Sequence, residues 1–204
     1  MLRHSPLKKI NRFSAVAAAA AAAALCAGVA LATVGPDYFG SNLNSTIQPS
    51  NAGNGQPCQI AGGPCTWVLN EAYGAPGREG APHDGTIRKL RLIAQSAGKF
   101  KLQVVKVNAA GEVTLKANGP MIEYIGQEGF GGGPEEFRVE KFDVNVPVKE
   151  GQYLAFKARK TSTLRCSSGG DNNLQLSPPL STVGEQRAPD AEDGCWLLIE
   201  AKVS

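Results

Sequence analysis

Several features that enzymes need are missing from this sequence. Beyond residue 32 there is one histidine, His83, so a multi-histidine metal centre is excluded by count and a Ser-His-Asp triad would have to use this residue. There is no G-x-S-x-G elbow, and the glycine run at 129–133 has no following lysine of the phosphate-binding type. Glu135 and Glu136 are adjacent, and adjacent strand residues point to opposite faces, so they do not form the opposed carboxylate pair of a glycosidase. The sequence predicts a protein that is not an enzyme, with no catalytic residues.

An excess of positive charge is missing as well, once the first residues are set aside. Four of the 21 Lys and Arg residues and none of the 18 Asp and Glu residues precede Ala32, which leaves 17 basic against 18 acidic residues and a net charge of −1. Nucleic-acid binding needs a basic excess or stripe, so no nucleic-acid partner is predicted.

Residues 1–32 have the three parts of a secretory signal peptide. A basic start is followed by an alanine-rich apolar stretch, and Ala30-Leu31-Ala32 fits an A-x-A cleavage site. The alternative is a membrane anchor, because the apolar run from Ala15 to Val34 approaches spanning length, but it is weakly hydrophobic and no basic cluster follows it. We expect cleavage, no membrane span afterwards, and a secreted or cell-surface location.

Four cysteines remain after cleavage, an even number in an oxidising environment: Cys58, Cys65, Cys166 and Cys195. Three pairings are possible. The sequence favours Cys58–Cys65, because the Gly/Pro-rich loop between them can bring its ends together, and then Cys166–Cys195. A zinc site is not indicated, because no C-x2-C pair exists.

The rest of the chain has the pattern of short runs and turn residues that is typical of a β protein. Residues 33–64 are rich in Gly, Asn, Ser and Pro and are predicted to be a poorly ordered lead-in, whereas residues 65–204 form the domain. There, short β-branched and aromatic runs are separated by turn residues, and no ten-residue stretch sustains helical periodicity. The expected strands are Thr66–Asn70, Thr86–Gln95, Lys99–Asn108, Glu112–Ala117, Met121–Gly126, Phe137–Val148, Gln152–Lys160, Asn173–Ser177 and Cys195–Val203.

Alternation within these runs indicates strands that are buried on one side. Phe100, Leu102 and Val104 share one face, as expected for antiparallel sheets. The apolar positions within Phe137–Val148 change parity, which predicts a β-bulge near Glu140-Lys141, and Ala110-Gly111 is a hairpin turn. Eight or nine short strands favour an all-β fold of two antiparallel sheets, a β-sandwich of the jelly-roll type, with the immunoglobulin-like sandwich as the alternative.

Two phrases resemble a known group of proteins. Asp84-Gly85-Thr86-Ile87 opens one strand, and the run from Val146 to Leu154 has the V-x-x-G-x-Y-L form of a turn into a core strand. Together they resemble a loosely defined group of secreted actinobacterial β-sandwich proteins. The second phrase is also similar to a turn in carbohydrate-binding jelly rolls and in the tumour-necrosis-factor/complement-like sandwich. The resemblance spans about residues 66–160 and implies the fold, with no functional residue attached.

Aromatic side chains are the candidate ligand contacts, because sandwich modules often present rings to sugars. Trp67 and Trp196 lie in apolar strands close to cysteines, so they are expected to pack in the core. Tyr73 and Phe130 lie among Gly, Ala and Pro, and are the predicted ligand-binding rings.

Calcium is the one cofactor that the sequence suggests, as a weaker hypothesis. Asp171, Asp190, Glu192 and Asp193 supply oxygen ligands in loops between Cys166 and Cys195, although their spacing fits no fixed calcium motif.

These observations lead to two hypotheses about function. The first is a non-catalytic, secreted or cell-surface module that binds a polysaccharide or cell-wall component. The alternative is a structural protein that self-assembles, and the sequence does not fix the oligomeric state.

Overall fold

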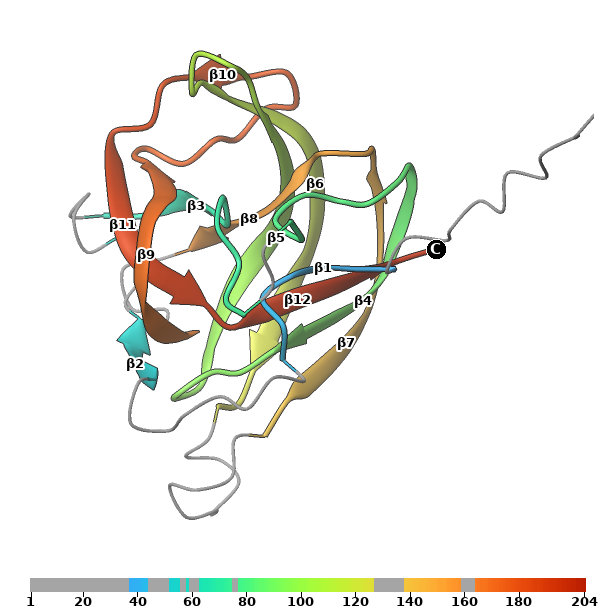
Figure 1. Ribbon diagram of the computed structural model, residues 1–204, viewed down its shortest axis with the longest axis vertical. Coiled ribbons are helices and arrows are strands. Elements are labelled where there is room, and N and C mark those ends of the chain that lie inside the picture. Colours follow the sequence, from blue (N-terminus) through green and yellow to red (C-terminus); the bar gives the residue numbers. More distant parts are fainter. Residues whose placement is uncertain are drawn as a thin grey trace, which may run out of the picture. The chain divides into compact units, whose positions relative to one another are not determined.

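The computed structural model describes residues 37–43, 52–55, 58, 63–74, 77–126, 138–158 and 164–204, and for 52–55 and 165–172 it describes the backbone alone. All regular elements in these residues are strands (Figure 1). They are β1 Tyr38–Gly40, β2 Ala52–Gly55, β3 Cys65–Val68, β4 Gly85–Leu92, β5 Gly98–Val107, β6 Val113–Tyr124, β7 Glu140–Val148, β8 Tyr153–Ala158, β9 Leu164–Leu176, β10 Gln186–Arg187, β11 Ala191–Leu197 and β12 Ile199–Val203.

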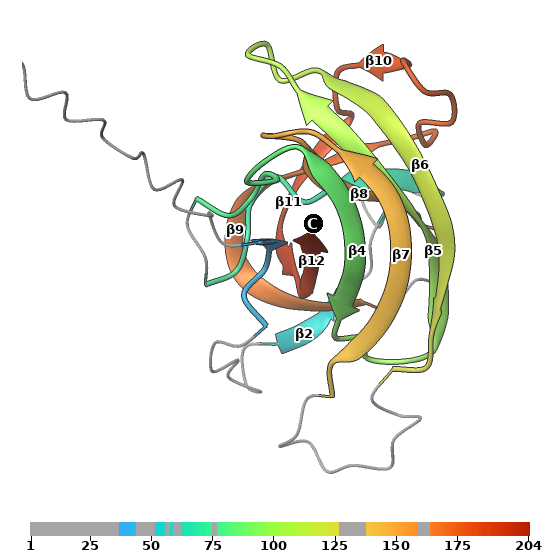
Figure 2. The same ribbon diagram turned by 90° about the vertical axis from the view of Figure 1, so that its right-hand side faces the viewer.

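The strands form two antiparallel sheets. The smaller sheet has the order β1-β12-β4-β7, and the larger one has the order β10-β6-β5-β8-β3-β9-β11, with β2 paired to β9. The larger sheet is strongly curled, so that in Figure 2 β5 and β6 curve along one side and β9 and β11 lie on the other. The prediction of an all-β fold with two antiparallel sheets is confirmed.

The main hydrophobic core lies between the two sheets. Phe100, Leu102 and Val104 of β5 point into it, as their alternation predicted, and meet Ile199 and Ala201 of β12. The core therefore fixes which side chains of the smaller sheet face outward: those that alternate with buried residues along β4, β7 and β12.

A second, smaller cluster lies on the outer face of the larger sheet. It includes Val105, Leu115, Leu174 and Leu176, and Leu180 from the segment between β9 and β10 packs onto it. Part of this outer face is thus covered, which explains why Gln103 is fully buried although it alternates with core residues.

The strand β6 joins two runs that the sequence analysis separated at Asn118-Gly119-Pro120. The ladder with β5 accommodates this interruption, because one residue of β5 lies opposite two residues of β6 between the pairs Lys101↔Met121 and Gln103↔Asn118. Gly119 lets the sheets approach closely there, since a Cβ at this position would lie 2.8 Å from Val146 Cγ2.

A register shift also occurs along β7, but not where it was predicted. It lies between Asp143 and Val146, opposite Ile87–Lys89 of β4, and the paired residues Lys141 and Glu140 show no irregularity. The bulge predicted near Glu140-Lys141 is therefore in the wrong place. The parity argument failed because it compared positions in β7 with Phe137 and Val139: Phe137 lies outside the described residues, and Val139 precedes the strand.

Two short strands lie in the segment that composition predicted to be a poorly ordered lead-in. β1 pairs with β12 and β2 pairs with β9, and Phe39 of β1 is fully buried in the main core. One compact unit accordingly spans Val34–Ser204. Composition missed these strands because each is held by a partner strand more than 100 residues away rather than by its own propensity.

Candidate functional site

Of the two aromatic residues predicted as ligand contacts, the structure describes Tyr73 alone. Phe130 lies outside the described residues. Tyr73 is half-buried, packs against the cluster of Leu43, Ile93 and Leu198, and its ring centroid lies 5.8 Å from that of Trp196 at an angle of 59°. A tilted, half-buried ring of this kind is held by the fold, although its neighbours along the chain are Gly and Ala. The role of Tyr73 as a ligand contact stays a prediction.

The tryptophans also differ from each other. Trp67 is 1% exposed and belongs to the main core, as predicted. Trp196 is only half-buried, and its Nε1–H donates a 3.0 Å hydrogen bond to a carboxylate oxygen of Glu71. Trp196 thus spans an apolar contact with Tyr73 and a polar one with Glu71, rather than filling a core position.

One of the two predicted disulfides is described in full. Cys58 and Cys65 are joined, with both residues completely buried. Cys195 is also disulfide-bonded. Its predicted partner, Cys166, is on the neighbouring strand β9, where it pairs with Leu197 of β11 and so lies diagonally across from Cys195. The side chain of Cys166 is outside the described part of the chain. That pairing stays a prediction.

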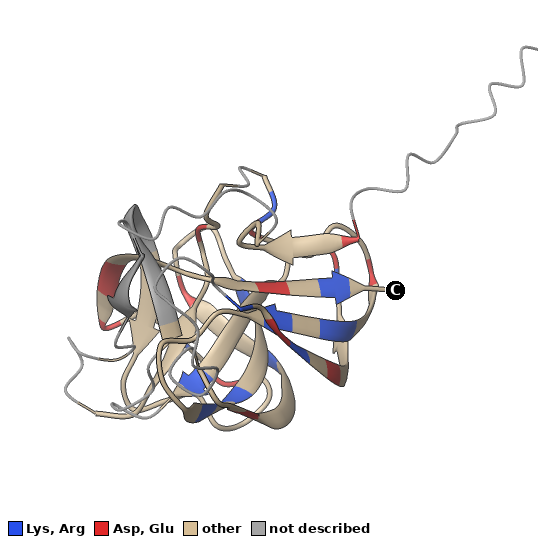
Figure 3. Ribbon diagram, turned by 90° about the horizontal axis from the view of Figure 1, so that it is seen from below, with Lys and Arg blue, Asp and Glu red and all other residues tan. Residues whose placement is uncertain are grey.

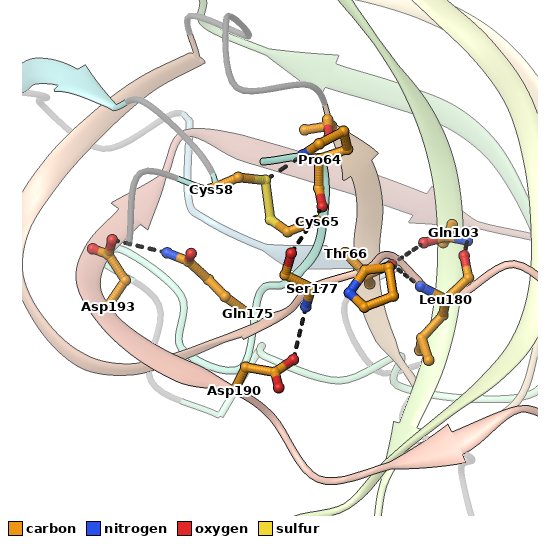
Figure 4. The surroundings of a disulfide bond; sticks show 12 residues. Cys58, Pro64, Cys65, Thr66, Gln103, Gln175, Ser177, Leu180, Asp190 and Asp193 are labelled. Atoms are coloured by element: carbon orange, nitrogen blue, oxygen red, sulfur yellow. Dashed lines mark hydrogen bonds between the residues drawn. A yellow bond between two sulfur atoms is a disulfide. The ribbon is translucent and has the colours of Figure 1, made fainter. Parts of the chain in front are cut away.

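The acidic residues of the calcium hypothesis have separate surroundings. An oxygen of Asp190 accepts the backbone N–H of Ser177 at 2.8 Å, and Asp193 accepts a 3.1 Å hydrogen bond from Gln175 (Figure 4). Glu192 neighbours Asp193 on β11 and is exposed. Burial raises the pKa of Asp193, against the hydrogen bonds from the Cys195 backbone and Gln175. The Asp171 side chain lies outside the described residues, and among those described no three His, Cys, Asp or Glu side chains group as metal ligands would.

The outer face of the smaller sheet brings together a set of side chains that sequence reasoning did not connect. Strand pairing sets Tyr38, Lys202, Lys89 and Asp143 in one row across the sheet, and Glu200, Arg91 and Lys141 in the next. We call this set, together with Arg78 from the segment between β3 and β4, the β1-side face. Figure 3 shows its basic residues as bands across the strands beside the labelled C-terminus.

At the centre of the β1-side face is a buried ion-pair triad. The Glu200 side chain is 1% exposed, and each of its carboxylate oxygens receives one guanidinium, from Arg78 at 2.8 Å and from Arg91 at 2.7 Å. Arg78 Nε also donates a 3.1 Å hydrogen bond to the carbonyl oxygen of Tyr38. Because a buried carboxylate is stable only when it is paired, Glu200 holds both arginines in fixed positions.

Tyr38 lies beside these cations. Its ring centroid is 6.0 Å from Arg91 Cζ and 5.5 Å from Lys202 Nζ, within the range of cation–π attraction. The ring is therefore held at the edge of the sheet by its neighbours, with part of its surface open to solvent.

A shallow cavity of about 480 Å³ opens on this face. It is lined by Tyr38, Lys89, Arg91, Lys141, Phe142 and Asp143. Lys89 is paired with Asp143, while Lys141 is exposed and makes no ion pair with any described residue. An anionic sugar can contact the guanidinium and the two ammonium groups with its charged groups, and the aromatic ring with one face of its sugar ring.

The comparisons with known proteins give no relative: no protein-family model, no curated protein and no solved structure matches the chain. The resemblance to secreted actinobacterial β-sandwich proteins therefore stays a prediction. Among the described residues there is no helix long and apolar enough to span a membrane.

Sequence reasoning missed the β1-side face for two reasons. Its members come from positions between 38 and 202, and only the pairing of β1, β12, β4 and β7 makes them neighbours. The one signal available was the alternation of charged with apolar residues in Arg88–Leu92 and Ile199–Val203, which indicates a polar outer face but not its partners.

Proposed function

We propose that the domain is a non-catalytic, exported module that binds an acidic polysaccharide of the cell surface through the β1-side face. The observation that carries the proposal is the cavity that combines the Tyr38 ring with Lys89, Arg91 and Lys141. Acidic sugars need both kinds of contact, since their carboxylate or phosphate groups pair with cations and their ring faces stack on aromatic side chains.

The charges of the β1-side face favour an anionic ligand. Its cations are Arg78, Lys89, Arg91, Lys141 and Lys202, and the carboxylates among or beside them are Glu200, Asp143 and Asp37. Two positive charges are in excess, on a chain whose predicted mature form has a net charge of −1. The positive charge is thus local, as expected for a site with one class of ligand rather than for general attraction to nucleic acid.

Retention on two cellulose derivatives tests the proposal. Carboxymethyl-cellulose carries carboxylates and hydroxyethyl-cellulose does not, while their backbones are the same. We expect the first to retain the protein and the second not to. In Lys89→Gln/Lys141→Gln the apparent dissociation constant should rise about tenfold, since each exposed charge pair contributes up to about 1 kcal/mol.

Lys106→Gln/Lys116→Gln is the matched control. It also removes two positive charges, but from a different cavity, which Lys106 and Lys116 line. Equal loss in both variants would show unspecific attraction and contradict the proposal. Equal retention on both celluloses would contradict it as well, and preferential retention by single-stranded DNA would identify a nucleic-acid site instead.

Export is a separate part of the proposal. The mature protein is expected outside the cytoplasm, with its N-terminus at or near Thr33, which N-terminal sequencing of the recovered protein would establish. Recovery of a membrane-bound form that begins at Met1 would favour the anchor alternative.

A further inference from the structure

Two lysines lie directly opposite each other on the outer face of the larger sheet. Lys101 of β5 pairs with Lys157 of β8, and both alternate with core residues, so both side chains point away from the main core. Like charges directly opposite in an antiparallel pair destabilise a sheet. A nearby anion would offset this loss of stability.

No described carboxylate forms an ion pair with either lysine, and Glu185 attracts Lys157 only as the weakest of its electrostatic influences. Lys157 Nζ contacts the hydroxyl of Ser181 at 3.3 Å, and Lys101 makes no ion pair with any described residue. The cross-strand lysines of the β1-side face differ in this respect: Lys89 is paired with Asp143 and Lys202 with Asp37. The unmatched pair on the larger sheet is therefore not a general feature of this fold.

A cavity of about 420 Å³ opens over the unmatched pair. It is lined by Pro64, Lys99, Phe100, Lys101, Met121, Lys157 and Ala158, a set that we call the lysine pocket. Lys99 contributes a third ammonium group and has Glu123 3.6 Å away. Met121 is 54% exposed, which adds an adaptable apolar surface beside the charges.

The covering segment between β9 and β10 leaves this pocket open. Thr66 Oγ1 donates to Gln103 Oε1 and accepts the N–H of Leu180, both at 2.9 Å, which fixes the segment over the neighbouring part of the sheet (Figure 4). The lysine pocket begins where this cover ends, at the contact of Ser181 with Lys157.

We propose that the lysine pocket is a second binding subsite for acidic polysaccharide, so that one chain bridges two polysaccharide strands. This inference rests on the proposed function for its ligand class. The outer faces of two packed sheets point away from each other, so one short sugar segment cannot occupy both sites. Two sites on one rigid domain raise the avidity for a network of polymer strands without any new contact.

The methyl group of Met121 reports on the lysine pocket directly. The chain has two methionines, and the signal of Met121 is assigned by its loss in Met121→Leu. In protein labelled with ¹³C-methyl methionine, we expect this signal to shift with trigalacturonic acid and not with maltotriose. The shift should persist in Lys89→Gln/Lys141→Gln. In Lys101→Gln/Lys157→Gln the dissociation constant that it reports should rise about tenfold.

The outcomes separate this inference from the proposed function. If Met121 does not respond while carboxymethyl-cellulose still retains the protein, the second subsite is wrong and the proposed function stands. If neither is observed, both are wrong. A shift that Lys101→Gln/Lys157→Gln does not weaken also overturns the subsite, provided that the variant keeps the melting temperature of the wild type or exceeds it.

Bridging has its own readout. At concentrations where sedimentation gives a monomer, the wild type is expected to aggregate beads coated with carboxymethyl-cellulose. The variants Lys89→Gln/Lys141→Gln and Lys101→Gln/Lys157→Gln are each expected to bind the beads without aggregating them. Aggregation by Lys101→Gln/Lys157→Gln that equals that of the wild type would overturn the bridging role.

Discussion

The outer faces of the two sheets both carry basic residues, but these residues have different partners on the two faces. On the β1-side face, Glu200, Asp143 and Asp37 each pair with a cation, and Glu200 is buried between two arginines. On the larger sheet, Lys101 and Lys157 face each other, and neither forms an ion pair with a described carboxylate. The stabilising contacts nearby are the neutral hydrogen bonds of Thr66 with Gln103 and Leu180. Most cations of the β1-side face are thus paired within the fold, Lys141 being the exception, whereas Lys101 and Lys157 are not paired.

The difference shows that the basic residues of a patch can be of two kinds: those paired with acidic residues of the fold, and those without such a partner. Where cations are paired inside the fold, removing an acid destabilises the protein, because buried or crowded charges lose their partners. Where cations are unmatched, removing one of them relieves repulsion and the protein becomes slightly more stable. Stability measurements can therefore distinguish the charges that are paired within the fold from those that are not.

Replacing Glu200 should have the largest effect. Glu200→Gln leaves Arg78 and Arg91 without their shared carboxylate, and we expect a loss of about 3 kcal/mol in the free energy of unfolding. Urea denaturation measures it. The control is Glu123→Gln, whose exposed pair with Lys99 should contribute less than about 1 kcal/mol. Equal effects would show that the triad is not a structural centre.

The neutral contacts on the larger sheet should follow. Thr66→Val keeps the side-chain shape but removes the partner of both Gln103 Oε1 and the Leu180 N–H, so we expect a loss of about 1–3 kcal/mol. Thr114→Val is the control, because its partner Gln186 is exposed and water can replace the hydroxyl; about 0.5 kcal/mol or less is expected. Unfolding in urea distinguishes the two, and a Thr66→Val variant as stable as Thr114→Val would contradict the prediction.

Removing one of the unmatched lysines should have a smaller effect of the opposite sign. Lys101→Gln relieves its repulsion from Lys157 and should stabilise the protein by about 0.5 kcal/mol at low ionic strength. Lys89→Gln removes a lysine that has an acidic partner and should give no such gain. Thermal unfolding with and without added salt measures both. A lower melting temperature for Lys101→Gln would mean that its charge is matched within the fold.

The smallest expected effect is the pH response of the segment that covers the larger sheet. The hydrogen bonds from the backbone N–H groups of Ser181 and then Thr182 lower the pKa of Glu185, with a weaker opposing contribution from burial. A lowered pKa in the folded state means that this stabilisation is present above the pKa of the unfolded carboxyl group and is lost as the pH falls through the folded value. In Glu185→Gln the pH-dependent part is absent. The difference in stability between wild type and variant should therefore shrink on acidification from about pH 6 to pH 3. A constant difference would contradict the prediction.

Much of the fold could be predicted because its signals are local. The alternation of Phe100, Leu102 and Val104 identified β5 and its buried face, and Ala110-Gly111 marked the β5–β6 hairpin, where Gly111 has a φ of +79°. The Cys58–Cys65 disulfide was predictable because only a short loop separates the two residues. The strands β1 and β2 could not be predicted, since β1 has only three residues, Tyr-Phe-Gly, and β2 consists of Ala, Gly and Asn.

The candidate site was less predictable than the fold. Tyr73 was proposed as an exposed ring from its neighbours in sequence, but its surroundings are set by Leu43, Ile93 and Trp196, which lie far from it along the chain. Tyr38, the ring that lies beside Arg91 and Lys202, belongs to a segment that composition did not distinguish from a linker.

The sequence by itself determined the strand-rich character, the sidedness of the longer strands and the short disulfide loop, because each depends on residues within about ten positions of one another. Only the tertiary structure decided which charges meet. The pairing of β12 with β4 places Glu200 against Arg91, and the pairing of β5 with β8 places Lys101 against Lys157. Both are contacts between segments more than 50 residues apart, and charge carries no signal of register along a chain. The physical reason is that hydrophobic burial fixes the register of the strands, and the charges on their outer faces take the neighbours which that register gives them.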